Sequence, residues 1–196
     1  MTVLADVQGI ETRRRLHGGT GGLPESAQML GKPLLLVDVD GVISLFGFPP
    51  DERPSGTWAT VDGIPHVLST RAAELLRGLS SDFELIWCTG WEEKADEHLP
   101  HLVGMPRGLH HLTFERSPGR KHAHWKLDAI EAHAGDRPLA WVDDALDDAC
   151  RAWAAARAAP TLLVATDPAK GLTEAEAAAL RAFAADVAGR GPSRAA

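Results

Sequence analysis

The sequence predicts an α/β fold in which helices cover both faces of a doubly wound parallel sheet. Short, almost wholly apolar runs recur at residues 34–39, 83–88, 138–142 and 161–165, as expected of strands buried on both faces. Segments with helical periodicity or helix-start signals separate these runs. Strands and helices therefore alternate along the chain, which is typical of a parallel sheet.

After the first strand comes a loop-rich insert, and then a helix. Residues 44–65 are rich in Gly and Pro, and short strands are expected around 58–61 and 67–68. A helix is expected over 70–80 because four apolar side chains share one face: Ala72, Leu75, Leu76 and Leu79.

The second half of the chain repeats the alternation. A helix is expected to start near Trp91, a short strand at 112–114 and a helix over 125–134. A helix over 145–158 should separate the last two strands. The last helix should run from Thr173 to about residue 188, since Thr173-Glu174-Ala175-Glu176 has the capping-box pattern.

These elements predict a single domain over residues 33–188. Residues 1–32 show no apolar periodicity and are expected to form a flexible arm. The glycine cluster at 18–22 is not a phosphate-binding P-loop, because neither Gly-Lys-Ser/Thr nor a preceding strand accompanies it. Residues 189–196 are expected to be a frayed tail.

Composition narrows the class of protein. The net charge of −7 disfavours nonspecific nucleic-acid binding, which usually needs a basic surface. It does not exclude binding through a local basic patch. Two cysteines, Cys88 and Cys150, are too few for a disulfide framework. Because we find neither a secretory signal pattern nor an apolar stretch of about 18 residues, we expect a cytoplasmic protein without membrane contact.

Two carboxylates, Asp38 and Asp40, close the first apolar run and precede Gly41. They should lie at the carboxyl end of the strand, where open α/β sheets bind their ligands. Side chains two residues apart share one side of an extended chain, and two acids so close repel each other unless a cation neutralises them. Mg²⁺ prefers such oxygen ligands. Alone, the run also fits a strand that ends in a polar turn.

Three further elements follow in order. Thr89 and Gly90 end the second apolar run, Lys126 begins a helix, and Asp143 and Asp144 end the third run. The order acid-x-acid, threonine, lysine, acid-acid over residues 34–166 resembles the haloacid dehalogenase-like (HAD) superfamily. Four segments are similar to a branch of that superfamily, the HAD domain of Swiss Army Knife RNA repair proteins: 87–91, 137–144, 160–164 and 171–173.

The resemblance implies a HAD-like Rossmannoid phosphohydrolase with a role for each matching residue. Asp38 would be the nucleophile and Asp40 the general acid and then base. Thr89 and Gly90 would bind the phosphate, and Lys126 would neutralise it. The insert after the first strand is too short for a large cap domain, and residues 92–120 offer little room for another, so we expect a minimal cap or none.

The resemblance also implies Mg²⁺, held by Asp38, the backbone carbonyl of Asp40, Asp143 and Asp144. Relatives use either adjacent or more widely spaced acids, so Asp144, Asp147 and Asp148 compete for the supporting position. For Asp147 and Asp148, an acidic first turn of a helix is the simpler interpretation. Lys121, in the loop before the helix, is a rival to Lys126.

The histidines include three close groups: His98-x-x-His101, His110-His111 and His122-x-His124. A zinc site needs convergent ligands, and no cysteine lies near any of them. Solvated histidines are therefore the favoured interpretation, and contact with substrate stays open.

The leading hypothesis is a Mg²⁺-dependent phosphatase that forms an aspartyl phosphate from a phosphomonoester. The substrate would be a small molecule or, as the branch suggests, a nucleic-acid end in RNA repair. One alternative is a catalytically silent binding protein with the same fold. Another is a phosphorylatable signalling module. In such modules the paired acids are the first motif along the chain, whereas in this sequence they are the last. Oligomeric state is left open.

Overall fold

The computed structural model describes residues 31–115 and 122–190. Its elements, in chain order, are β1 (Leu34–Val37), β2 (Ser44–Leu45), β3 (Thr57–Val61), β4 (Ile64–Leu68), α2 (Thr70–Leu79), β5 (Glu84–Trp87), α3 (Glu93–Val103), β6 (His110–His111), the 3-10 helix η1 (His124–Lys126), α4 (Leu127–Ala134), β7 (Leu139–Asp143), α5 (Asp148–Ala156), β8 (Thr161–Ala165) and α6 (Glu174–Arg190). In this part of the chain no helix has the length and apolarity needed to cross a bilayer.

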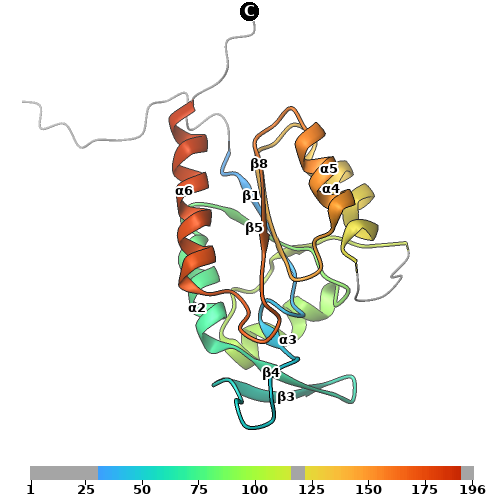
Figure 1. Cartoon of the computed structure of the whole chain (residues 1–196), viewed down its shortest axis with the longest axis vertical. Coiled ribbons are helices and arrows are strands. Elements are labelled where there is room, and N and C mark those ends of the chain that lie inside the picture. The colour runs from blue at the N-terminus through green and yellow to red at the C-terminus, as the bar shows by residue number, and fades with distance from the viewer. Residues whose placement is uncertain (1–30, 116–121, 191–196) are drawn as a thin grey trace, which may run out of the picture.

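The predicted fold class is confirmed. Five parallel strands form one sheet in the order β6-β5-β1-β7-β8, with β1 in the middle. Helices α2 and α6 lie on one side of this sheet and α4 and α5 on the other (Figure 1). Because β1 is flanked by β5 and β7, the residues that follow these three strands meet at one edge of the sheet.

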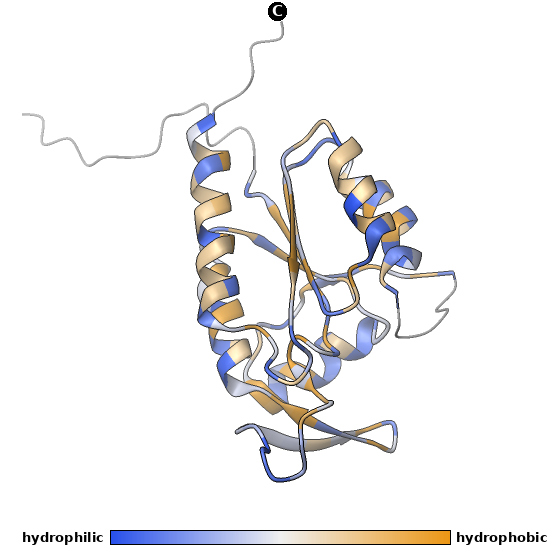
Figure 2. Ribbon diagram, in the orientation of Figure 1, coloured by the Kyte–Doolittle hydropathy of each residue, from blue (hydrophilic) through white to orange (hydrophobic). Residues whose placement is uncertain are grey.

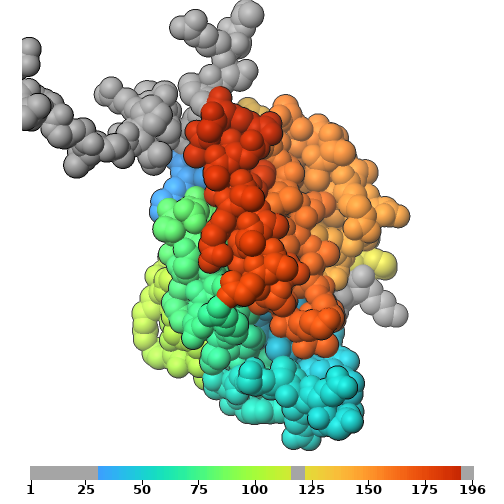
Figure 3. All heavy atoms as spheres, turned by 60° about the vertical axis from the view of Figure 1, so that its left-hand side comes forward, coloured from blue at the N-terminus to red at the C-terminus, as the bar shows by residue number. Residues whose placement is uncertain are grey.

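Strict alternation along β1 explains the two covered faces. Leu35 and Val37 belong to the core that includes the buried faces of α2, α3 and α6, whereas Leu34 and Leu36 belong to the core formed with α4 and α5. All four side chains are at most 1% exposed. The central strands are accordingly coloured as hydrophobic in Figure 2. Figure 3 shows α6 lying along α2 at the surface.

The insert between β1 and α2 forms a second, small sheet in the order β2-β4-β3. Two short strands were expected here, and the structure has three, all paired antiparallel. This sheet projects at the end of the molecule toward which β1 runs (Figures 1 and 3). Its strands are few and short compared with the rest of the structure, consistent with the expectation of a minimal cap.

Local hydrogen bonds explain where the boundaries differ from the predictions. The first strand ends at Val37 rather than 39, because Val39 O accepts bonds from the N–H groups of Ile43 and Ser44 and the chain turns. Helix α5 begins at Asp148 rather than 145, because the Asp147 carboxylate caps it. The strand expected at 112–114 lies instead at β6, where it pairs with the end of β5.

The expected arm and tail fall mostly outside the described residues. Of the arm, the structure describes only residues 31 and 32, neither of which belongs to a helix or strand. Gly189 and Arg190, predicted as tail, are the last two residues of α6. The single domain over 33–188 stays a prediction.

Candidate active site

A pocket of about 220 Å³ opens where the carboxyl ends of the central strands meet. Asp38 follows β1 directly, Gly90 lies shortly after β5, and Asp143 is the last residue of β7. The lining residues come from these strand ends and from the segments around them: Asp38, Asp40, Phe46, Gly90, His122, Ala123, Trp125, Lys126, Asp143, Asp144 and Ala145. Six of the seven predicted site residues therefore share one pocket.

The Lys126 ammonium lies between two buried carboxylates. Its Nζ is 3.0 Å from Asp38 Oδ2 and 2.6 Å from Asp143 Oδ2. The three residues are 3%, 7% and 0% exposed, respectively. Burial alone would lower the pKa of Lys126, but the two carboxylates outweigh it and hold the pKa well above its ordinary value. Lys126 is thus a fixed cation, while the rival Lys121 lies outside the described residues.

The backbone fixes the other oxygen of each acid. Asp38 Oδ1 accepts a hydrogen bond from Val39 N at 2.7 Å, and Asp143 Oδ1 accepts one from Ala145 N at 2.9 Å. Each carboxylate therefore keeps its Oδ2 turned toward Lys126. This arrangement positions both acids before any ligand arrives.

Asp144 completes a cluster of three acids. Ligand oxygens of Asp38, Asp143 and Asp144 lie within 4.8 Å of one another. Burial and the neighbouring carboxylates raise the pKa of Asp143, and they raise that of Asp144 to about 7. Buried acids that repel in this way favour a divalent cation, and an all-oxygen donor set suits Mg²⁺. The residues thus fit the metal that the resemblance implies.

Gly41 allows Asp144 to approach the acidic loop. Its φ of +70° lies in the left-handed region, and a Cβ at this position would stand 2.4 Å from Asp144 Cγ. Glycine is therefore needed for conformation and for space. The Gly41 carbonyl also accepts a hydrogen bond from Thr166 Oγ1 at 2.8 Å, which ties the loop to the end of β8.

Asp40 is oriented by an aromatic neighbour. Trp91 Nε1 donates to Asp40 Oδ2 at 3.3 Å, and the Trp91 ring packs edge-on against His66, with ring centroids 4.8 Å apart. His66 Nδ1 in turn shares a hydrogen bond of 2.8 Å with Ser44 Oγ. The small sheet, which carries Ser44 and His66, therefore helps to hold Asp40 at the pocket.

Thr89 and Gly90 occupy the turn before α3. Gly90 lines the pocket, whereas Thr89 is only 1% exposed. The Thr89 hydroxyl accepts a hydrogen bond from Trp91 N at 3.3 Å, and its own O–H remains a donor. Thr89 is thus the one predicted site residue that does not line the pocket, although it lies next to Gly90, which does.

The more distant acids do not join the cluster. Asp147 is the N-cap of α5, where its side chain accepts from Cys150 N. Asp148 lies in the first turn of α5 and pairs with Arg151. Both positions agree with the interpretation of these acids as part of a helix start. Of the three rivals for the supporting position, only Asp144 lies in the cluster with Asp143.

Sequence reasoning missed two aromatic side chains that line the pocket, Phe46 and Trp125. It left contact with substrate open for His122, which also lines the pocket. Trp125 immediately precedes Lys126, and its ring centroid is 5.5 Å from the Lys126 Nζ. Phe46 is 37% exposed, unusual for a large apolar side chain beside buried acids. Proximity in sequence to predicted site residues was the available signal.

Comparison with family models matches residues 34–177 to the HAD domain in Swiss Army Knife RNA repair proteins. The chain belongs to this family. Membership confirms the resemblance drawn from the sequence and implies a phosphohydrolase type of function for this HAD domain. A separate comparison with curated proteins finds no match.

Proposed function

We propose that this HAD domain is a Mg²⁺-dependent phosphatase that hydrolyses a phosphomonoester through an aspartyl phosphate on Asp38. The observation that carries the proposal is the position of Asp38, held at the pocket by Val39 N and Lys126, with Asp40 lining the same pocket. A buried carboxylate beside a fixed cation and a second acid suits phosphoryl transfer, in which charge must be offset.

In the first half-reaction an Asp38 oxygen attacks the phosphorus. The bond from phosphorus to the leaving oxygen breaks, and its electron pair stays on that oxygen. A protonated Asp40 gives the leaving oxygen its proton, so an alcohol departs. Lys126 offsets the charge on the phosphoryl oxygens, which Thr89 and Gly90 also bind through O–H and N–H donors.

In the second half-reaction water attacks the phosphorus of the aspartyl phosphate. Asp40, now a carboxylate, takes a proton from this water. The bond between phosphorus and Asp38 breaks, and inorganic phosphate leaves. Asp38 is thereby restored as a carboxylate and Asp40 as an acid, so the cycle closes.

Asp38, Asp143 and Asp144 would hold Mg²⁺, together with the backbone carbonyl of Asp40. When bound, the ion supplies positive charge that screens the anionic nucleophile from the anionic substrate. The residues themselves set the position of the nucleophile, since Oδ1 of both Asp38 and Asp143 is bonded to the backbone.

The test is a phosphatase assay joined to trapping of the covalent intermediate. With a phosphate-labelled aryl phosphate and Mg²⁺, acid-quenched protein should carry labelled phosphate. Asp38→Asn should carry no label, and its turnover should fall by several orders of magnitude. Asp128→Asn is the matched control, since this exposed carboxylate in the first turn of α4 does not line the pocket. Turnover that persists in Asp38→Asn would refute the nucleophile.

Phosphate binding without turnover or label in the unmodified protein would instead favour the silent binding protein with the same fold. Chelation provides the second arm: activity should vanish and return with Mg²⁺ better than with Ca²⁺, whose longer and more numerous bonds loosen the geometry. Full activity in excess chelator would remove the metal from the proposal.

For the substrate class we infer a phosphorylated nucleic-acid end. The family is one of HAD domains in RNA repair proteins, and two aromatic side chains, Phe46 and Trp125, line the pocket. Aromatic faces stack on bases, each stack being worth about 1–3 kcal/mol. The small cap leaves the pocket accessible to a polymer end, although the net charge of −7 opposes long-range attraction.

A comparison of phosphorylated oligonucleotides with an aryl phosphate tests this class. Phe46→Ala should lower kcat/KM for the oligonucleotide about tenfold and leave the aryl phosphate nearly unchanged. Trp58→Ala is the matched control, because Trp58 is 58% exposed on β3 and does not line the pocket. A preference for small phosphates, unaffected by Phe46→Ala, would contradict the inference.

A further inference from the structure

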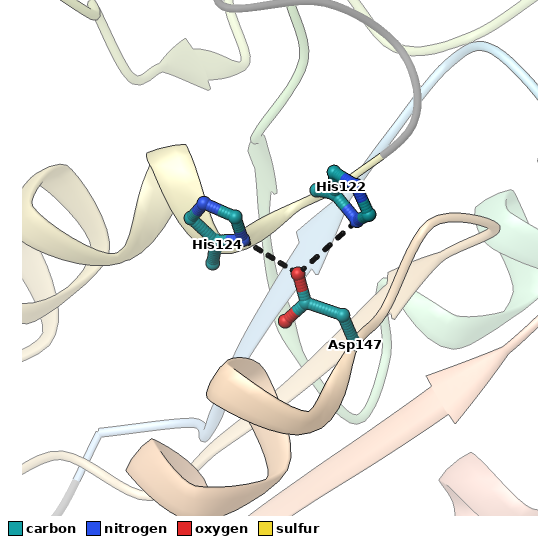
Figure 4. Close-up of side chains that lie close together, drawn as sticks. All are labelled: His122, His124 and Asp147. Carbon is teal, nitrogen blue, oxygen red and sulfur yellow. Dashed lines mark hydrogen bonds and ion pairs between the residues drawn. The ribbon is translucent and has the colours of Figure 1, made fainter.

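The side chains of His122, His124 and Asp147 point toward one another (Figure 4), and His122 also lines the pocket. His124 Nδ1 lies 2.5 Å and His122 Nδ1 lies 3.6 Å from the same oxygen, Asp147 Oδ2. The two rings lie alongside each other with centroids 5.6 Å apart. Within the described residues this is one of two groups whose ligand atoms fall within 4.8 Å of one another; the other is the cluster of three acids.

The backbone holds both sides of this group. Ala123, between the two histidines, is 1% exposed, and its N–H donates to Ala145 O at 2.9 Å. Asp147 Oδ1 accepts from Cys150 N at 3.0 Å, which leaves Oδ2 facing the imidazoles. The buried Ala123 therefore positions the two histidines, and the hydrogen bond that caps α5 orients the carboxylate of Asp147.

The distances suit a small transition-metal ion. Bonds of about 2.0–2.1 Å in a tetrahedral site place ligand atoms about 3.3 Å apart. The separation of 3.6 Å between His122 and Asp147 is close to this value, and the 2.5 Å between His124 and Asp147 need open by less than 1 Å. The histidine side chains are 63% and 48% exposed, so they are free to make this adjustment.

The donor set separates this group from the cluster of acids. Two imidazole nitrogens and one carboxylate oxygen match zinc sites with three protein ligands, in which water takes the fourth position. Mg²⁺ prefers oxygen ligands throughout, as the cluster of acids offers. The sequence interpretation favoured solvated histidines because no cysteine lay nearby; the structure supplies Asp147 as the missing partner.

We propose that His122, His124 and Asp147 form a second metal site, specific for Zn²⁺ over Mg²⁺, that clamps the segment before η1 to the start of α5. The site is independent of the proposed phosphatase activity, since none of its ligands is assigned a role in that reaction. His122, Ala123 and Ala145 line the pocket, so the ion would add positive charge at its rim.

Titration calorimetry with Zn²⁺ in excess Mg²⁺ tests the site in the full chain. We expect one Zn²⁺ per chain and a higher melting temperature on binding. Co²⁺ should give the visible absorption of a tetrahedral ion. The double variant His122→Ala/His124→Ala, and Asp147→Asn, should weaken Zn²⁺ binding by at least about tenfold. The Asn side chain retains an oxygen that can cap α5, so the fold should survive.

Two controls locate the binding. His101→Ala removes an exposed histidine outside the group, and Asp144→Asn alters the cluster of acids; both should bind Zn²⁺ like the unmodified chain. Zn²⁺ should also shift the imidazole NMR signals of His122 and His124 in the unmodified protein. Absence of Zn²⁺ binding, equal affinity in the double variant, loss in Asp144→Asn, or shifts confined to other histidines would overturn the proposal.

Discussion

Replacing Lys126 by Met should destabilise the metal-free protein strongly. The substitution keeps much of the side-chain volume but removes the cation that Asp38 and Asp143 share at 3.0 and 2.6 Å. Both carboxylates are less than 10% exposed, so neither gains enough water to compensate. Breaking a buried ion pair from one side costs about 3–5 kcal/mol, because the remaining charge is buried without a partner.

Thermal and urea unfolding in a chelator measures this cost. For a chain of this length, 1 kcal/mol corresponds to about 2–4 °C, so the melting temperature should fall by roughly 6–20 °C. Mg²⁺ should recover part of the loss in Lys126→Met, since the ion neutralises the same acids. Adding Asp38→Asn to Lys126→Met should also recover stability, because one of the two unpaired charges disappears.

Lys94→Met is the matched control for this experiment. Lys94 pairs with Asp62 at the surface, where the two side chains are 45% and 55% exposed, and solvent screens such pairs so that they contribute little to stability. Equal losses in Lys94→Met and Lys126→Met, or no recovery from Asp38→Asn, would refute the shared-charge reasoning. In Mg²⁺, turnover of Lys126→Met should still be about 10²–10³ lower, since the phosphoryl charge lacks its partner.

Three further changes probe the same pocket. Asp40→Asn should slow turnover by about 10²–10⁴, with the larger loss for alkyl than for aryl phosphates; equal losses would contradict its role as acid. Gly63→Ala should cost about 1–2 kcal/mol in unfolding experiments for its positive φ, and Gly41→Ala should cost at least as much, since its Cβ would also meet Asp144. Only Gly41→Ala should raise the Mg²⁺ needed for half-maximal activity, because open space surrounds the Cβ position of Gly63. The pKa of Asp144 is raised to about 7, so this group favours folding fully below about pH 4, and its contribution is lost as pH rises through 7. In chelator, the loss of stability between about pH 4 and pH 7 should therefore be smaller in Asp144→Asn by about 1 kcal/mol after allowance for solvent screening, or about 2–4 °C of melting temperature. A pH profile of stability like that of the unmodified protein would count against the raised pKa.

Much of the candidate site could be predicted from the positions at which the apolar runs end. The runs that became β1, β5 and β7 are buried on both faces, and such strands must end in polar residues at one edge of the sheet. Asp38, Thr89 and Asp143 could therefore be assigned to that edge from their positions alone. Their order along the chain also supported the family resemblance, which the family comparison confirmed.

Element boundaries depended on contacts that apolar periodicity does not encode. The Asp147 cap starts α5 three residues later than the apolar pattern suggested, and the turn closed on Val39 O shortens β1. The small antiparallel sheet gained a third strand, β2, because Ser44 and Leu45 pair with β4 across the insert. In each case a hydrogen bond between separate positions decided the outcome.

The sequence by itself determined the fold class, the edge of the sheet that carries the acids and the family, because these depend on local hydrophobicity and on the order of motifs. Only the tertiary structure decided which charges share a partner. Lys126 reaches both Asp38 and Asp143, and Asp147 meets His122 and His124. These segments come together because Ala123, just before η1, and Cys150 of α5 belong to the same buried core. Such contacts join residues many positions apart, and no short-range pattern specifies them.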